Sequence, residues 1–429
     1  MSPTPRAALL FGAVALSALL VPVALAALAA AVLLGAVVAD ALAVRRRPAL
    51  RRSVPDVLAR GVPARLSIAL APSADSTADG GAIAAGATLR VRQASVPDLE
   101  IAPREGDGGA LEARVVGLRR GRHTLPGVAA RAVGPLGLGA WYHGASASEG
   151  VELRVYPDMP AARRLALAVR LGRFREPGAV PRGPLGLGTE FESVREYQPD
   201  DDIRQVNWRA TARLGRPMSN DYRLERDREV VCLVDAGRLM AAPLRDRTRL
   251  DAAVDAAVAV ALVADVVGDR CGVVVFDSEV RRRLPARRAG GEAVVQALYD
   301  VEPRPVESDY ELAFRALGGT KRSLVIVFSD LLDAAAARSL VDAVPVLARR
   351  HAVAVASASD PDLAALVRSS PGSAADVYAA AAALDVLDER AAVAARLRHA
   401  GAEVIEAPAE GLGAACAGVY LRAKARARL

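Results

Sequence analysis

The chain is poor in lysine, aromatic residues, cysteine and histidine. Among its 429 residues the lysines are Lys321 and Lys424, aromatic residues make up 4%, and there are three cysteines and four histidines. The cores must therefore consist mainly of alanine, valine and leucine, and a hydrophobic fraction of 52% is enough to build them. The formal net charge of +7 comes from arginines interspersed with acids, so we expect no nucleic-acid partner.

The cysteines and histidines also lack the spacing of a metal centre or a catalytic site. Cys232, Cys271 and Cys416 fit small buried side chains in a reducing compartment better than a disulfide or a reactive thiol. No histidine pair has zincin spacing, and the sequence contains neither a Gly-x-x-x-x-Gly-Lys-Ser/Thr phosphate loop nor a Gly-x-Ser-x-Gly elbow. We therefore expect no enzyme activity and identify no small-molecule substrate.

An apolar run without charge extends from Ala7 to Ala39. An apolar span of about 20 residues crosses a bilayer. A cleaved signal peptide is the competing interpretation, but its apolar region is usually about 7–15 residues long. It should also not be followed by the arginine cluster at 45–52. Residues 1–48 are therefore predicted to form a membrane anchor that is retained.

The anchor is predicted to consist of two helices, because Pro22 divides the apolar run into residues 7–21 and 23–44. One long tilted span is the alternative. In both arrangements the arginines after the run outnumber those before it. The positive-inside rule then holds the rest of the chain in the cytoplasm, at the inner membrane.

Residues 53–157 have the pattern of a β domain. Short stretches of alternating apolar and polar residues are separated by clusters of glycine, proline, serine and aspartate. This pattern predicts an all-β antiparallel sandwich of immunoglobulin-like size. The stretches lie at 64–70, 87–92, 111–116 and 151–156.

Residues 158–228 are predicted to be a connector followed by a segment dense in acids and arginines. The three aspartates at 200–202 lack the alternating spacing of a calcium loop and are more consistent with a turn and helix cap. The surrounding charges are interpreted as a network of ion pairs. Tyr197 and Trp208 are predicted to anchor the segment on a neighbouring domain, and an exposed protein-binding patch is the alternative.

Residues 229–429 alternate strands and helices, which predicts a doubly wound, Rossmann-like α/β domain. The first strand, 230–234, is apolar on both sides, as in a parallel strand covered by helices on both faces. Asp235 follows this strand, and Asp330 follows the strand at 323–328. Open α/β sheets bind ligands at this carboxyl edge, so the two aspartates define the predicted site.

Several motifs in this part of the chain resemble the bacterial family catalogued as domain of unknown function 58. The resemblance is carried by Gly188-Thr-Glu-Phe, Arg195-Glu-Tyr-Gln-Pro-Asp-Asp-Asp-Ile-Arg204, Asn207-Trp208, Ser308-Asp309-Tyr310, the stretch 324–332 and Arg349-Arg350-His351. It implies a von Willebrand factor A-like domain at the C-terminus. It also implies an association with MoxR-type AAA+ ATPases that supports assembly or maturation of other proteins.

The same resemblance implies where a metal ion would bind. In von Willebrand A domains a divalent ion is held by Asp-x-Ser-x-Ser, a threonine and a second aspartate, which correspond here to Asp235, Ser308 and Asp330. Gly237 and Leu239 replace the two serines, so the site is degenerate and would suit Mg²⁺ with a largely aqueous shell. The competing interpretation is that both aspartates cap helices or hold loops.

We expect a membrane-anchored, non-catalytic interaction protein whose C-terminal domain docks a MoxR-type AAA+ ATPase or its client. The alternative is a cell-envelope enzyme or lipid-linked factor that uses the acidic segment 196–202. The signature residues assigned to partner binding or to structure are Glu190, Arg195, Tyr197, Asp201, Asp202, Arg204 and Trp208.

Overall fold

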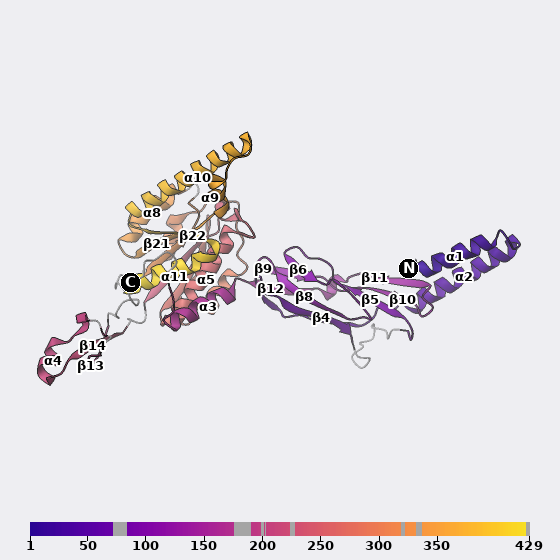
Figure 1. Ribbon diagram of the computed structural model, residues 1–429, viewed down its shortest axis with the longest axis horizontal. Coiled ribbons are helices and arrows are strands. Elements are labelled where there is room, and N and C mark those ends of the chain that lie inside the picture. The colour runs from indigo at the N-terminus through magenta and orange to yellow at the C-terminus, as the bar shows by residue number, and fades with distance from the viewer. Residues whose placement is uncertain are drawn as a thin grey trace. The chain divides into compact units, whose positions relative to one another are not determined.

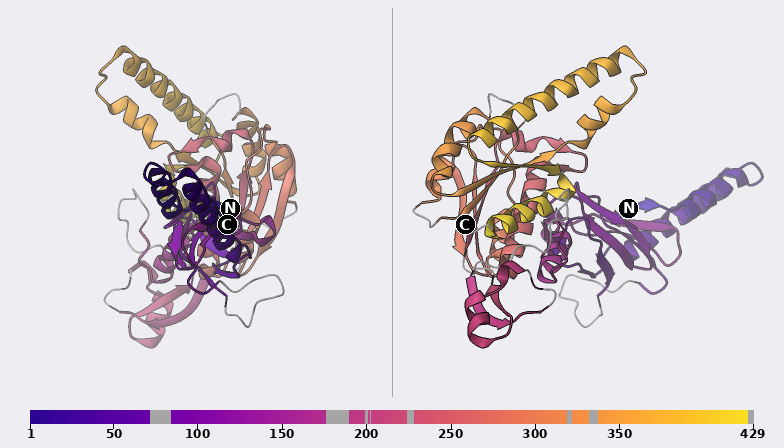
Figure 2. Two further views of the ribbon diagram at one scale, coloured as in Figure 1. Left: turned by 90° about the vertical axis from the view of Figure 1, so that its right-hand side faces the viewer. Right: turned by 60° about the vertical axis from the view of Figure 1, so that its left-hand side comes forward.

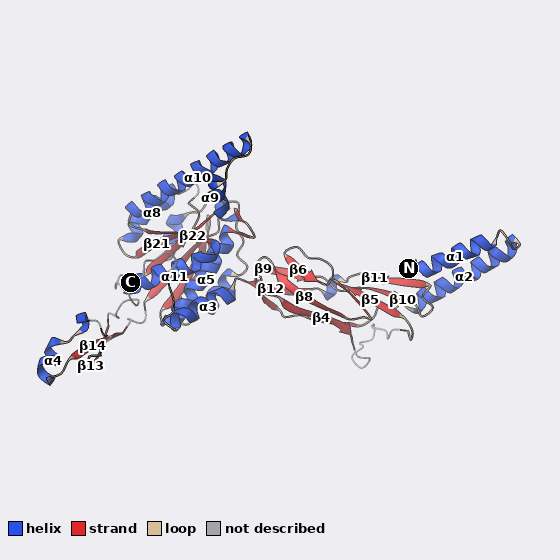
Figure 3. Ribbon diagram, viewed as in Figure 1, coloured by secondary structure: helices blue, strands red, loops and turns tan. Residues whose placement is uncertain are grey.

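A computed structural model describes residues 1–71, 84–175, 190–198, 201, 203–223, 228–318, 322–331 and 337–425. The chain divides into two units, Met1–Tyr156 and Pro157–Leu429. Figure 1 colours both units along the chain, and Figure 3 distinguishes their helices from their strands.

The apolar N-terminal run folds as two helices, α1 (Pro5–Ser17) and α2 (Val23–Ala43). The chain breaks at Pro22, which has no N–H group to continue a helix from α1. Thr4 caps α1 through its side chain and also donates a hydrogen bond to the Gly137 carbonyl at 2.6 Å. By length and composition, α2 is long and apolar enough to cross a membrane.

The loop at 134–139 holds the end of α2. The carboxylate of Asp40 accepts hydrogen bonds from the backbone N–H groups of Leu136 (2.9 Å), Leu138 (2.8 Å) and Gly139 (2.9 Å). At Gly139 an added Cβ would come within 2.3 Å of the Val37 carbonyl oxygen, so only glycine allows the loop to approach so closely. This loop, the anchor clamp, ties the helical hairpin to the β strands of the same unit.

The remainder of the first unit consists of three sheets, with strand orders β1-β11-β10-β5-β7, β3-β12-β9 and β2-β4-β8-β6. Pairing is antiparallel except between β3 and β12. The four predicted strands correspond closely to β4, β5, β8 and β12. The bounds are β1 Ser2–Pro3, β2 Leu50–Ser53, β3 Val57–Ala59, β4 Ala64–Leu70, β5 Thr88–Arg92, β6 Leu99–Ala102, β7 Glu105–Asp107, β8 Leu111–Gly117, β9 Gly121–Leu125, β10 Ala129–Val133, β11 Gly139–His143 and β12 Val151–Tyr156.

The signature segment of the second unit forms a small element that we call the signature lobe, residues 190–198, 201 and 203–223. It contains the antiparallel hairpin of β13 (Glu190–Glu196) and β14 (Met218–Arg223), a 3-10 turn η3 (Ile203–Gln205) and helix α4 (Trp208–Leu214). The helix α3 (Met159–Arg170), which precedes the lobe in sequence, packs on α5 of the same unit.

A six-stranded sheet forms the core of the second unit, with strand order β19-β18-β15-β20-β21-β22. All pairs are parallel except that of β18 with β19, an antiparallel edge strand. The strand bounds are β15 Glu229–Asp235, β18 Arg270–Phe276, β19 Val280–Arg287, β20 Leu324–Phe328, β21 Ala352–Ser359 and β22 Glu403–Pro408, and β16 Pro243–Leu244 pairs with β17 Arg247–Thr248 outside the sheet. The chain moves from β15 to β18 on one side and later to β20 on the other, so the topological switch point lies between β15 and β20.

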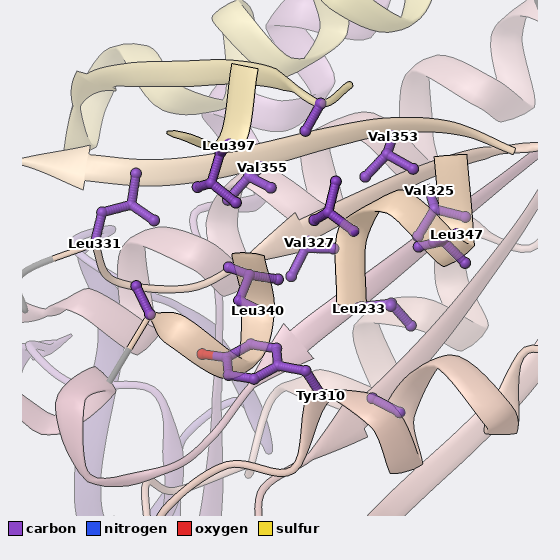
Figure 4. Packing of buried hydrophobic residues seen from close by; sticks show 14 of the residues in the cluster. Leu233, Tyr310, Val325, Val327, Leu331, Leu340, Leu347, Val353, Val355 and Leu397 are labelled. Atoms are coloured by element: carbon purple, nitrogen blue, oxygen red, sulfur yellow. The ribbon is translucent and has the colours of Figure 1, made fainter. Parts of the chain in front are cut away.

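Helices cover both faces of this sheet, as the apolar strands predict. Helices α5 and α11 pack on one face, and α7, α8 and α10 pack on the other. Figure 4 shows the second face, where Leu233, Val327 and Val355 from neighbouring strands meet Leu340 and Leu397 from the helices. The helix bounds are α5 Arg249–Val267, α6 Gly291–Leu298, α7 Tyr310–Ala316, α8 Arg338–Ala348, α9 Pro361–Arg368, α10 Ala374–His399 and α11 Ala409–Ala425.

Helix α10 extends beyond the sheet that it covers. Its C-terminal part buries Val393, Ala394 and Leu397, whereas most residues of its N-terminal half are exposed. In the right-hand view of Figure 2 this N-terminal half runs past the sheet with α9 beside it. We call the projecting part of α10, residues 374–389, the arm.

Candidate functional site

Asp235 lies at the switch point, at the carboxyl end of β15, and is only 2% exposed. Its Oδ1 accepts hydrogen bonds from the Gly237 N–H (2.8 Å) and the Ser308 hydroxyl (2.5 Å). Its Oδ2 accepts hydrogen bonds from the Tyr310 and Ser329 hydroxyls, both at 2.8 Å. Those two hydroxyl oxygens are 2.7 Å apart. Both carboxylate oxygens of Asp235 are therefore engaged by the chain's own donors.

Burial makes a negative charge on this cluster less favourable. Burial raises the pKa of the Asp235 carboxyl, and the four hydrogen bonds offset only part of that effect. Burial also raises the pKa of Tyr310 well above its usual range, and the negative charge of Asp235 adds to the shift. Tyr310 therefore remains a hydroxyl donor at neutral pH, and its ring packs edge-on against Phe276 at 5.4 Å between centroids.

Asp330, at the end of the neighbouring strand β20, faces a different set of partners. Its Oδ1 accepts hydrogen bonds from Arg249 of α5 (3.0 Å) and Arg390 of α10 (2.8 Å). All three side chains are buried, and Arg390 also donates to the Ser357 hydroxyl at 3.0 Å. The cluster joins helices from both faces of the sheet, and removal of one partner from such a buried pair typically costs about 3–5 kcal/mol.

The predicted metal ligands do not form one coordination site. The structure brings Ser308 onto Asp235, but it turns Asp330 toward two guanidinium groups that would repel a cation. Of the four carboxylate oxygens of Asp235 and Asp330, Oδ2 of Asp330 is the one that lacks a hydrogen-bond partner, and one free oxygen does not make a divalent-ion site. The described part of the chain contains no group of three or more His, Cys, Asp or Glu side chains placed to hold a metal ion. These residues therefore do not fit Mg²⁺ in this arrangement.

Gly237 leaves the space that the contact between Ser308 and Asp235 requires. A Cβ added at Gly237 would lie 2.2 Å from the Ser308 hydroxyl oxygen and 2.8 Å from the Val306 carbonyl oxygen. A serine at 237 would thus displace Ser308 from Asp235. Gly237 and the hydrogen bond from Ser308 to Asp235 therefore depend on each other.

Three of the predicted signature residues stiffen the signature lobe from within. Arg195 binds the Asp201 carboxylate through two hydrogen bonds of 2.7 and 2.5 Å, and the Gln198 N–H donates to the same carboxylate. Tyr197 donates its hydroxyl to the Asp201 carbonyl at 3.1 Å. The hydrogen bond from Arg195 lowers the pKa of Asp201, so this carboxyl is an ionised structural acceptor.

The other signature residues lie elsewhere in the lobe. Trp208 begins α4 and is 69% exposed, which agrees with the alternative of an exposed patch rather than with anchoring. The backbones of Glu190 and Arg204 lie in β13 and η3. Asp202 is outside the described residues. Among the signature residues whose side chains the structure describes, Trp208 is therefore the most available to a partner.

The most important partners of the two aspartates were not predicted. Arg249 and Arg390 are 81 and 60 residues from Asp330 in sequence, so no local pattern links them. Tyr310 belongs to the Ser308-Asp309-Tyr310 motif, but the sequence does not indicate that its hydroxyl donates to Asp235. A second unpredicted cluster lies at the C-terminal helix, where buried Lys424 binds both oxygens of buried Asp269 at 2.7 and 2.6 Å.

Comparison of the sequence with known proteins identifies a family for the second unit. Residues 193–394 match the family model described as "Protein of unknown function DUF58". The match confirms the resemblance drawn from the signature motifs, and it covers the lobe and most of the sheet.

The similar curated proteins are themselves uncharacterized. They include uncharacterized protein Rv1480 of Mycobacterium tuberculosis and uncharacterized protein Mb1516 of Mycobacterium bovis, each 29% identical over 190 residues. The alignment covers 43% of this chain and 58% of each relative. Because the chain spans little more than half the length of these relatives, a function for the whole protein is a proposal.

Proposed function

We propose that this protein is a membrane-anchored, non-catalytic interaction protein. Its C-terminal unit, which we interpret as von Willebrand factor A-like, docks a MoxR-type AAA+ ATPase or its client in protein assembly or maturation. The N-terminal hairpin holds it in the inner membrane, and the rest of the chain faces the cytoplasm. We interpret the β strands of the first unit as an immunoglobulin-like sandwich that follows the anchor in sequence.

The observation that carries this proposal is the polar network at the switch point. Ligands of open α/β sheets bind at this edge, yet here Asp235 accepts four internal hydrogen bonds and Asp330 is paired with two buried arginines. General acid–base or metal chemistry requires a carboxylate that can reach substrate or ion. Because the carboxylates are bonded within the chain, they hold the loops at this edge in place, and these loops can then form a rigid surface for a protein partner.

The chain segments over this network present charge to the surrounding solvent. The backbone of Arg238 donates to the Val306 carbonyl at 2.9 Å, and its half-exposed side chain forms an ion pair with Glu307. This rim of 236–238 and 304–308, in which Arg238, Arg304 and Glu307 are exposed, is the part of the C-terminal unit that we assign to partner docking. Rim charges of this kind set the rate and specificity of association.

The membrane assignment rests on α2 and on the arginines that follow it. Helix α2 has 21 residues and a mean hydropathy of 2.4. The charge asymmetry around the hairpin favours a cytoplasmic location for the remaining chain. A reporter fused after Leu429 should be active only if it is retained in the cytoplasm, and activity on the outer side would contradict this orientation.

Partner recovery from membranes tests the docking proposal. The tagged full-length chain is purified from detergent-solubilised membranes, co-purifying proteins are identified by mass spectrometry, and any AAA+ ATPase is then rebound as a purified protein. We expect recovery of the ATPase and at least an about tenfold loss with Arg238→Glu, because a like charge at a docking rim disfavours the complex.

A matched control is available in the first unit. Arg65 forms an exposed ion pair with Glu112, so Arg65→Glu makes the same charge change far from the rim in sequence. Both variants should fold, since exposed ion pairs contribute about 0–1 kcal/mol. Failure of the wild-type chain to recover an AAA+ ATPase, or equal losses with the two variants, would refute the proposal.

A further inference from the structure

The arm on α10 exposes apolar side chains without covering them. Val377 is 52% exposed, Tyr378 77% and Leu384 47%, and on the adjacent α9 Leu366 is 41% exposed. Val377 and Leu384 are seven residues apart, which places them on the same side of the helix. A helix that offers anchors at this spacing is suited to lie against an apolar partner surface.

The arm is also acidic, in a chain that is otherwise rich in arginine. It carries four carboxylates, and the sequence between Arg368 and Arg390 contains no lysine or arginine. Asp385, Asp388 and Glu389 are exposed on α10. The surface that complements the arm must therefore be both basic and apolar.

Helix α4 of the signature lobe has the opposite charge, since it carries two arginines and no acid. Ile203 is 70% exposed, Trp208 69% and Leu214 54%, so the lobe offers apolar contact area. Arg209 and Arg213 are both exposed and lie four residues apart on α4, where they share one side of the helix. Tryptophan and arginine are the residues most often found at the energetic centre of protein interfaces.

The lobe is built to present these side chains in a fixed arrangement. The Arg195–Asp201 pair and the Tyr197 hydrogen bond hold the loop before α4, and Asn207 caps α4 by accepting from the Ala210 N–H at 2.9 Å. Internal bonds of this kind lower the entropy lost when the lobe binds a partner. The signature residues thus support the exposed ones.

We propose that the signature lobe of one copy of this chain docks on the acidic arm of a second copy. The apolar side chains of the two surfaces would meet, with the arginines of α4 against the carboxylates of α10. The contact joins unlike surfaces, so each copy keeps one free lobe or arm and can bind a further copy. Copies anchored in one membrane plane would form a row or a ring. The proposal does not depend on an AAA+ partner.

Charge reversal tests this pairing with the full-length chain in detergent micelles. The lobe-reversed variant carries Arg209→Glu and Arg213→Glu, and the arm-reversed variant carries Asp385→Arg and Asp388→Arg. Two differently tagged copies are mixed, one tag is captured, and the recovered amount of the other tag is measured. We expect each variant to lose recovery of its own kind at least about tenfold, because like charges then face each other.

The decisive measurement is the mixture of the two variants. The acidic lobe of one variant then meets the basic arm of the other, so recovery should return to within about threefold of the wild-type value. A chain that carries all four substitutions should also recover its own kind. Recovery should fall with added salt, since exposed charges are screened.

Three results would overturn the proposal: no recovery between wild-type copies, recovery that charge reversal leaves unchanged, or a mixture that does not restore it. Crosslinking of lobe to arm within single monomers would show instead that the occupant is the same chain. Arg163→Glu with Arg164→Glu, at exposed positions of α3, is the control with an equal charge change. Circular dichroism of every variant confirms that its fold is retained.

Discussion

The network around Asp235 predicts different outcomes for two substitutions at one position. Asp235→Ala removes the acceptor for four donors, but Tyr310 and Ser329 lie 2.7 Å apart and can still bond to each other. The buried Gly237 N–H and the partly buried Ser308 hydroxyl lose their partner. An unpaired buried donor costs about 1–3 kcal/mol, so we expect Asp235→Ala to lower the free energy of unfolding by about 3–5 kcal/mol.

Asp235→Asn should be much milder. Its carbonyl oxygen still accepts from Gly237 and Ser308, and its amide donates to the hydroxyl oxygens of Tyr310 and Ser329, which can rotate their protons. The hydroxyls of Tyr310 and Ser329 can still bond to each other, and one of their two hydrogens is left without an acceptor. We therefore expect a loss of about 1 kcal/mol near neutral pH.

The pH dependence distinguishes the neutral network from one that needs a charged carboxylate. Burial raises the pKa of Asp235, so the folded state holds this proton more tightly than the unfolded state does. The resulting stability is fully present below the unfolded-state pKa of about 3.9 and is lost as pH rises through the folded-state pKa. Asp235→Asn lacks this contribution, so its deficit relative to wild type is largest near pH 4 and narrows toward neutral pH.

Hydrogen exchange of the β15 and β20 peptides, followed by mass spectrometry over a urea series at acidic and neutral pH, reports the local free energy of opening. Corrections for intrinsic exchange are made at each pH. If the stability of wild type relative to Asp235→Asn instead increases as pH rises, the ionised carboxylate is stabilising and the reasoning fails. Protection of wild type alone by added Mg²⁺ would restore the metal assignment.

Two further predictions concern buried contacts. Lys424→Met leaves buried Asp269 without its cation and should lower the free energy of unfolding by about 3–5 kcal/mol. Arg422→Met removes an exposed ion pair on the same helix and should lower it by at most about 1 kcal/mol. Hydrogen exchange of α11 peptides over a urea series compares the two variants, and similar losses would contradict the role of burial. Asp40→Ala should accelerate exchange of the amides in the anchor clamp, including that of Gly139, and unchanged protection there would show that the carboxylate does not hold the loop.

The sequence predicts the features that depend on local pattern. The apolar strand 230–234 becomes the central β15, Asp235 falls at its carboxyl end, and the break at Pro22 separates two helices. Strands β4, β8 and β12 also follow their alternation closely, because each has one buried face. Burial patterns of this kind can be predicted from each segment of the sequence by itself.

The features that depend on distant partners were not predictable. The family resemblance implies a metal-binding role for Asp330, and nothing near it in sequence reveals Arg249 or Arg390. The β13–β14 hairpin was also missed, since its residues are mostly polar or charged and its strands carry few apolar side chains to mark a face. Only the fold decides which arginine meets which carboxylate.

The anchor clamp has a mechanical consequence for the first unit. Asp40 and Thr4 hold the same short loop from the two helices of the hairpin, so neither helix can turn without carrying that loop and its flanking strands β10 and β11. If the hairpin is embedded in lipid, a change in its tilt also changes the orientation of β10 and β11. Bilayer thickness would then influence the angle between these strands and the membrane plane.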